Sequence, residues 1–170
     1  MKLYILRHGD AVEHGDSRFK ESERPLTPKG IQRTKQLAHL LRQMEISFDV
    51  VLSSPLTRAR QTAEIIARGL QLSDKVELTD HLGPAGSMEK LVERIHVLRS
   101  DSVLLAGHEP YLSGFISLLC IGAPNLPLKM KKGALCRLEV DSISCGKCAT
   151  LEWLLQPRLI GIKPSNRTLE

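Results

Sequence analysis

Two arginines and two histidines have the types and the spacing that phosphoryl chemistry needs: Arg7, His8, Arg58 and His108. Arginine carries a permanent positive charge on a planar fork that fits phosphate oxygens. Histidine changes its protonation state near neutral pH and can act as a nucleophile, an acid or a base. Phosphoryl transfer requires little more than a well-placed nucleophile and positive charge around the transferred group. These four residues are therefore the candidate catalytic residues.

Each candidate follows a short apolar run that has the length and composition of a β-strand. Open α/β sheets present their ligand-binding residues at the carboxyl ends of the strands. Any one of these residues alone has a simpler explanation, as an exposed arginine or a solvated histidine. Their arrangement on three strand ends favours a common site instead. The three runs span residues 3–6, 50–52 and 103–106.

Arg58 is expected in the first turn of a helix. Ser54 suits the N-cap position and Pro55 the first helical position. The helix should run from about Pro55 to Arg68 and stop at Gly69. The first turn exposes N–H groups and the positive end of the helix dipole, so Arg58 stands at a natural anion-binding position.

Four segments of the chain resemble the histidine phosphatase superfamily, also called phosphoglycerate mutase-like. They occur in the order of that family, and the resemblance extends to about Val140. The short chain and the Gly-His-Glu-Pro form of the last segment are most similar to the SixA-like phosphohistidine phosphatases. The segments are Arg7-His8-Gly9, Leu-Thr-Pro-Lys-Gly at 26–30, Ser-Pro-Leu-Thr-Arg-Ala-Arg-Gln-Thr-Ala at 54–63, and Gly-His-Glu-Pro at 107–110.

The resemblance implies a covalent mechanism with His8 as the nucleophile. A neutral imidazole attacks phosphorus and becomes a phosphohistidine, which water then hydrolyses. Arg7, Arg58 and a charged His108 are expected to hold the phosphoryl oxygens, and Gly9 is expected at the phosphate because glycine permits close backbone approach. No metal or other cofactor is expected, since no cluster of carboxylates suited to magnesium is visible.

The proton donor for the leaving group stays open in the sequence. The candidates are Glu109 and Asp10, with Glu13 and Asp80 as weaker ones, and Glu109 has an alternative role as a helix cap. A phosphatase of esters must protonate an alkoxide, whereas an imidazole leaving group needs much less help. A site with a weak acid, or none, therefore favours phosphohistidine as the substrate.

The leading hypothesis is a phosphohistidine phosphatase that acts on a protein partner, such as a phosphorelay or phosphotransfer domain. A metal-independent phosphatase of small phosphate esters on the same scaffold is the first alternative. A mutase is disfavoured because the chain is too short for the insertions that enclose a sugar phosphate. A phosphate- or phosphoprotein-binding module is the non-enzyme alternative.

Length and composition indicate one globular α/β domain over residues 1–156, followed by an irregular tail over 157–170. The net charge of +5 fits an anionic substrate or partner. Aromatic residues make up only 4% and no basic helix carries interleaved aromatics, which argues against nucleic acid as a partner. No apolar run approaches the roughly 20 residues of a membrane span and no signal-peptide pattern is present, so a cytoplasmic protein without membrane contact is expected.

Strands that alternate with helices and then a closing hairpin predict a three-layer α/β fold, with a mixed, mostly parallel sheet and helices on both faces. Thr27 is expected to cap the first helix, and the polar segment 14–24 should form a loop over the first strand end. The other expected elements are a short strand at 76–78, helices at 88–98 and 111–121, and hairpin strands at 134–140 and 149–155.

The cysteines have two interpretations. Cys120 and Cys136 lie in apolar runs and are expected to be small core residues. Cys145 and Cys148 lie where the hairpin turn is expected, and a redox or metal role remains an alternative for this pair. Disulfides are not expected without a secretion signal.

Overall fold

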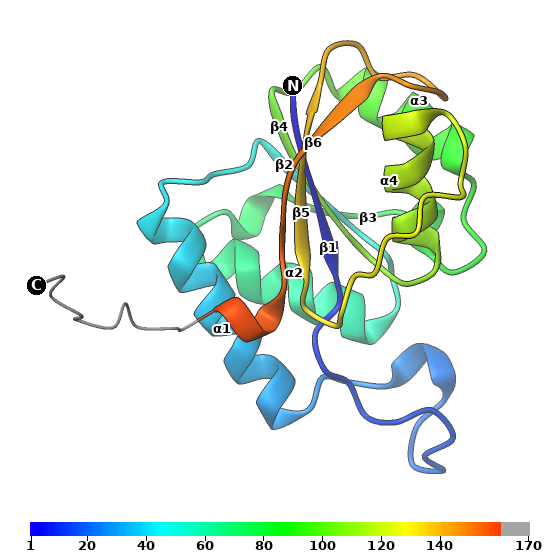
Figure 1. The fold of residues 1–170 in the computed structure, drawn as a ribbon. Coiled ribbons are helices and arrows are strands. Elements are labelled where there is room, and N and C mark those ends of the chain that lie inside the picture. Colours follow the sequence, from blue (N-terminus) through cyan, green and yellow to red (C-terminus); the bar gives the residue numbers. More distant parts are fainter. Residues whose placement is uncertain (161–170) are drawn as a thin grey trace, which may run out of the picture.

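A six-stranded mixed sheet lies between two layers of helices in the computed structural model, which describes residues 1–160 (Figure 1). The strand order is β3-β2-β4-β1-β5-β6. This confirms the expected α/β fold with a mostly parallel sheet. The strands are β1 (Lys2–Arg7), β2 (Val50–Ser53), β3 (Val76–Leu78), β4 (Ser102–Gly107), β5 (Leu135–Val140) and β6 (Ala149–Leu155), and the α-helices are α1 (Pro28–Gln43), α2 (Thr57–Gly69), α3 (Met88–Leu98) and α4 (Tyr111–Ile121).

The strands β2, β4 and β1 run parallel and lie side by side, with β4 in the middle. Arg7 at the end of β1 is level with Gly107 of β4, and Ser53 at the end of β2 is level with Ala106. All three carboxyl ends therefore meet at one edge of the sheet, as the sequence predicted. The strands β5 and β6 pair antiparallel beyond β1 and complete the sheet.

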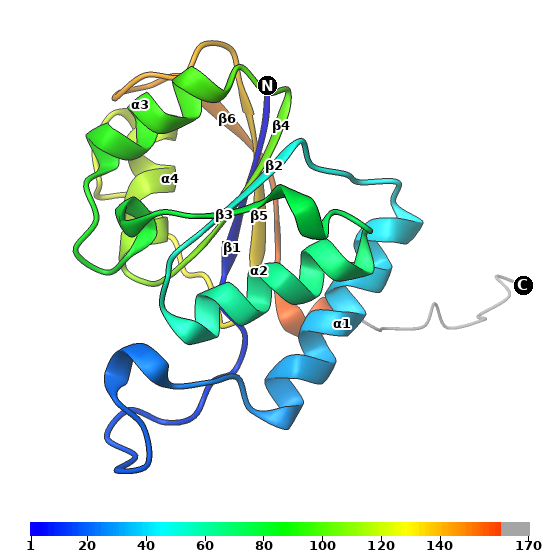
Figure 2. The ribbon, with the colours of Figure 1, turned by 180° about the vertical axis from the view of Figure 1, so that it is seen from behind.

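Alternating side chains of the central strands build two separate cores. Leu3 and Ile5 of β1 pack with residues of α3 and α4, whereas Tyr4 and Leu6 pack with residues of α1 and α2. Figure 2 shows α1 and α2 on one face of the sheet and α3 and α4 on the other. Because successive strand residues point to opposite faces, a strand that is covered on both sides reads as a continuous apolar run.

The cap of α1 is as predicted, but the start of α2 is not. The Thr27 side chain accepts a hydrogen bond from the Gly30 amide at 3.0 Å. The helix α2 begins at Thr57 rather than at Pro55, and Leu56 is its N-cap residue without a side-chain bond. Ser54 lies ahead of the helix, where its hydroxyl accepts the Leu56 amide at 3.3 Å and also bonds a histidine of the site. Arg58 still lies in the first turn.

The hairpin of β5 and β6 contains Cys145 and Cys148 in its turn, as predicted, and all four cysteines are unpaired. The tail that follows was expected to be irregular. Its first residues form a single 3₁₀ turn, Pro157–Leu159, and Ile160 packs against the core beside α1 and α2. The rest of the predicted tail, 161–170, lies outside the described residues. No helix within residues 1–160 is both long and apolar enough to cross a membrane.

Candidate active site

A cleft of about 540 Å³ lies at the carboxyl edge of the sheet and collects the four candidate residues. Arg7, His8 and His108 reach it from the ends of β1 and β4, and Arg58 reaches it from the first turn of α2. The rings of His8 and His108 lie with their centroids 5.1 Å apart. His8 and His108, which are 100 positions apart in the sequence, thus meet in one cleft, as their positions after two strands predicted.

His8 is held as a neutral ring with one defined nitrogen donor. It is 6% exposed, and its Nδ1 lies 2.8 Å from the Gly9 carbonyl oxygen. Burial lowers the pKa of His8 to about 3, and the positive charges of Arg58 and Arg7 act in the same direction. Since the carbonyl can only accept, Nδ1 carries the hydrogen, and Nε2 keeps its lone pair as a nucleophile.

His108 is also neutral, contrary to the charged ring that the sequence suggested. Burial, followed by the charges of Arg58 and Arg7, lowers its pKa to about 4. Its Nε2 lies 2.9 Å from the Oγ of Ser54, which is fully buried. Ser54 Oγ accepts the Leu56 amide at 3.3 Å, so its own hydrogen can be donated to Nε2. The hydrogen of His108 then resides on Nδ1, a buried atom without a partner among residues 1–160.

The two arginines are fixed by backbone carbonyls. Arg7 donates from Nη1 to the Met130 carbonyl at 2.8 Å, and Arg58 donates from Nη1 to the Glu21 carbonyl at 2.9 Å. Arg58 is 5% exposed and Arg7 is half-buried, and this burial lowers the pKa of both guanidinium groups. The Nε atoms of both side chains are buried and lack a partner within the described part of the chain.

The segment 14–24 contributes residues that sequence reasoning missed. The carboxylate of Glu21 lies 3.2 Å from Nη2 of Arg58 and also bonds Arg24 and His14. The bond from Arg24, together with that from His14 and the nearby charge of Arg58, lowers the pKa of Glu21 to about 2. Arg24 lines the cleft as a third guanidinium group. The many charged residues of the segment 14–24 are the sequence feature that could have indicated this contribution.

Gly9 does not take the phosphate-binding position that was predicted for it. Its amide donates to Oγ1 of Thr62 at 3.0 Å, and Gly9 is absent from the lining of the cleft. A Cβ atom at Gly9 would lie 2.9 Å from Oγ1 of Thr34 in α1. The close approach that requires glycine here is to the helix α1.

The four candidate proton donors separate in space. Glu109 and Glu13 line the cleft, whereas Asp10 lines a neighbouring pocket, and Asp80 lines neither. Glu109 accepts a hydrogen bond from Ser113 at 2.7 Å through Oε2, and its Oε1 is buried without a partner within residues 1–160. Asp10 bonds Arg33 at 3.2 Å, away from the nucleophile. Among residues 1–160, no group of three or more His, Cys, Asp or Glu side chains is arranged to hold a metal ion.

Comparison with known proteins assigns the sequence to a family. The family model described as the histidine phosphatase superfamily, branch 1, matches residues 3–97, more than half of the chain. The chain belongs to this superfamily. The match includes β1 with Arg7 and His8, and α2 with Arg58. It ends before His108, which the structure itself brings to the cleft.

Two relatives and one solved structure cover most of the length of this histidine phosphatase. An uncharacterised protein of Picosynechococcus sp. is 36% identical over 142 residues, which are 82% of this chain and 85% of that protein. Phosphohistidine phosphatase SixA of Escherichia coli is 29% identical over 160 residues, 92% of this chain and 94% of the relative. A solved structure of the protein histidine phosphatase SixA complexed with tungstate superposes with a TM-score of 0.81 at 28% identity and covers 93% of this chain and 98% of that one.

Proposed function

We propose that this histidine phosphatase removes the phosphoryl group from a phosphohistidine of a partner protein, such as a phosphorelay or phosphotransfer domain. The observation that carries the proposal is the state of His8, a buried neutral ring whose Nδ1–H is tied to a carbonyl beside two desolvated arginines. The similarity to SixA of Escherichia coli, whose name gives it this activity, supports the choice of substrate.

In the first step, Nε2 of His8 attacks the phosphorus atom in line with the leaving group. A bond forms between Nε2 and phosphorus while the bond between phosphorus and the substrate imidazole breaks, and that imidazole departs with the electron pair. In the second step, a water oxygen attacks phosphorus, the bond to Nε2 breaks, and inorganic phosphate leaves with both hydrogens of the water as dihydrogen phosphate. His8 then returns to its neutral state.

Arg7, Arg58 and His108 hold the oxygens of the transferred group. The charges of the two arginines are removed from water and fixed by Met130 and Glu21, so little reorganisation is needed when charge develops on the phosphoryl oxygens. A donor of this kind contributes about 3 kcal/mol to lowering a barrier. The neutral His108 contributes its Nδ1–H, and Ser54 acts as a positioning residue that keeps the hydrogen on that atom.

The leaving group separates this proposal from the ester alternative. An imidazole whose second nitrogen is protonated leaves as a neutral molecule, whereas an alkoxide must receive a proton from the enzyme. Glu109 has one oxygen bonded to Ser113 and the other buried without a partner among residues 1–160. Because Glu109 lines the cleft, a phosphatase of small phosphate esters with Glu109 as its proton donor is the second candidate function.

Steady-state kinetics on two substrate classes test the proposal. The value of kcat/KM should be higher for a phosphohistidine-bearing phosphotransfer domain than for any member of a panel of phosphate esters, and a chelator should not change it. Strong turnover of esters without activity on phosphohistidine would reject the proposal in favour of the ester phosphatase. Tight binding of the phosphoprotein without any turnover would favour the binding module.

A further inference from the structure

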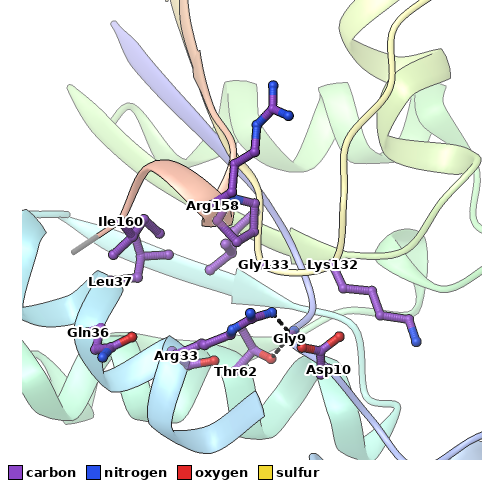
Figure 3. A pocket seen from close by; sticks show the side chains of 13 residues that line it. Gly9, Asp10, Arg33, Gln36, Leu37, Thr62, Lys132, Gly133, Arg158 and Ile160 are labelled. Atoms are coloured by element: carbon purple, nitrogen blue, oxygen red, sulfur yellow. Dashed lines mark hydrogen bonds and ion pairs between the residues drawn. The ribbon is translucent and has the colours of Figure 1, made fainter. Parts of the chain in front are cut away.

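A second pocket opens beside the catalytic cleft on the side of α1, and we refer to it as the lateral pocket. Its walls come from the turn after β1, from α1, from the loop before β5 and from the 3₁₀ turn after β6 (Figure 3). Gly9 and Asp10 directly follow the nucleophile His8 and line this pocket. Lys132 lines both the pocket and the cleft. The lateral pocket and the cleft are therefore neighbours that share one lining residue.

The lining of the lateral pocket carries more positive than negative side chains. Arg33, Lys132 and Arg158 are exposed and line the pocket from three different elements, with the guanidinium group of Arg158 directed away from Arg33 (Figure 3), while Asp10 supplies a single carboxylate. Arg33 already bonds the Asp10 carboxylate at 3.2 Å through one nitrogen, with its guanidinium group turned toward the pocket (Figure 3). A guanidinium fork has donors for a further carboxylate. The balance of three cations to one anion therefore favours an acidic ligand.

The wall that carries Lys132 is fixed before any ligand arrives. The Gly133 amide donates to the carbonyl oxygens of Arg7 and His8 at 3.1 and 2.9 Å. The Gln156 side chain donates to the Lys129 carbonyl at 2.8 Å and ties the loop to the end of β6. Binding at a preformed site costs less conformational entropy than binding at a mobile one.

The lateral pocket is small. Its volume is about 240 Å³, which lies below the roughly 300–1,000 Å³ of small-molecule sites. A single acidic side chain fits such a space. We propose that the lateral pocket binds a glutamate or aspartate of the phosphoprotein substrate, near its phosphohistidine in space, while the phosphoryl group occupies the cleft. This inference rests on the proposed function and assigns to it a docking contact for the protein part of the substrate.

Phosphohistidine peptides provide the test. One set carries a single glutamate at successive positions on either side of the phosphohistidine, and a matched set carries glutamine there. Wild-type protein should prefer the best glutamate peptide over its glutamine counterpart by about three- to fivefold in kcat/KM at low salt, as expected for an exposed charge pair. The preference should shrink at high salt because the charges are screened.

Two double variants locate the effect. Arg33→Gln with Arg158→Gln removes two charges of the lateral pocket and should abolish the glutamate preference. Arg42→Gln with Arg68→Gln removes two exposed charges of α1 and α2 that line neither the cleft nor the lateral pocket, and it should retain the preference. Hydrolysis of phosphoimidazole, which has no peptide part, should be unchanged in both. If the loss of Arg33 prevents folding, Arg158→Gln alone should reduce the preference.

Equal turnover of the glutamate and glutamine peptides by wild-type protein would overturn the inference. An equal loss in the Arg42 and Arg68 variant would assign the effect to net charge. Acetate that lowers turnover of the glutamate peptide alone would instead support the inference, because it would compete with the glutamate carboxylate for the pocket. If phosphate esters are hydrolysed while phosphoimidazole and every phosphohistidine peptide are not, the proposed function itself fails, and this outcome is distinct from a missing glutamate preference.

Discussion

The two edges of the parallel sheet treat their polar groups in opposite ways. At the amino edge, the Asp49 carboxylate accepts the amides of Asp101 and Ser102 at 3.0 and 2.9 Å, and the Ser102 hydroxyl donates to the Ser47 carbonyl at 2.7 Å. These groups tie the start of β4 to the start of β2. Each has a partner, which is the usual condition of polar groups that stabilise a fold.

At the carboxyl edge, polar groups are buried without partners. Six side-chain atoms are buried and unpaired within residues 1–160, and four of them belong to residues that line the cleft: Arg7, Arg58, His108 and Glu109. Burial of an unsatisfied polar group costs about 1–3 kcal/mol. This cost falls at the cleft for which we propose phosphoryl binding, whereas the paired polar groups at the amino edge stabilise the fold.

The largest expected effect is a loss of catalytic activity when a residue of the carboxyl edge is replaced. Arg58→Ala should lower kcat/KM by about two to three orders of magnitude, because it removes positive charge from the developing transition state. The protein should remain folded in thermal unfolding. Arg60→Ala is the matched control, since Arg60 lies in the same helix and forms an exposed ion pair with Glu64. Normal turnover of the Arg58 variant, together with a lower stability, would show that Arg58 has only a structural role.

Removal of the carboxylate at the amino edge should lower stability and leave activity unchanged. Asp49→Ala should lower the free energy of unfolding by about 1 kcal/mol, because two backbone amides lose a charged acceptor. Its kcat/KM should stay at the wild-type value. Denaturant unfolding and kinetics on the same preparations measure both quantities, with Asp49→Asn as a milder change. A loss of activity without a loss of stability would contradict the assignment of a purely structural role to the amino edge.

Stability should depend on pH through the carboxyl edge. The folded pKa values of His8 and His108, about 3 and about 4, lie below the ordinary value of 6.5, so the unfolded chain binds protons first. The free energy of unfolding should therefore fall as pH drops from 6.5 to 4.5, by up to about 1.4 kcal/mol per pH unit for each ring. Glu21, with a pKa of about 2, loses its contribution only at lower pH.

Denaturant unfolding between pH 7 and 4.5 measures this dependence. Replacing both rings by glutamine should flatten it, whereas Asp49→Ala should leave the slope unchanged. An unchanged slope in the variant without the two rings would show that they are not held neutral by burial.

The smallest effect is expected at Glu109. Glu109→Gln should change kcat/KM on a phosphohistidine protein by less than about twofold, because a neutral imidazole leaves without a strong acid. Hydrolysis of phosphate esters should fall in the same variant if Glu109 donates a proton there. A collapse of phosphohistidine turnover would mean that the carboxyl edge contains a committed acid.

The sequence predicted the strand ends and the helices well because burial on both faces leaves continuous apolar runs in β1 and β4. It placed four candidate residues in one cleft because parallel strands share a carboxyl edge. It erred at Gly9 and Ser54, whose partners Thr62 and His108 are more than fifty residues away. It also suggested a charged His108. The pKa of this ring depends on its burial and on the charges of distant residues, which a local sequence pattern does not contain.

The most direct test of the central claim is a search for the covalent intermediate on His8. Wild-type protein mixed briefly with a labelled phosphohistidine protein and quenched in alkali should carry label that is stable to base and labile to acid. Mass spectrometry should place it on His8, and His8→Ala should carry none and turn over no substrate. Label that persists on the His8 variant, or full turnover by that variant, would contradict the account.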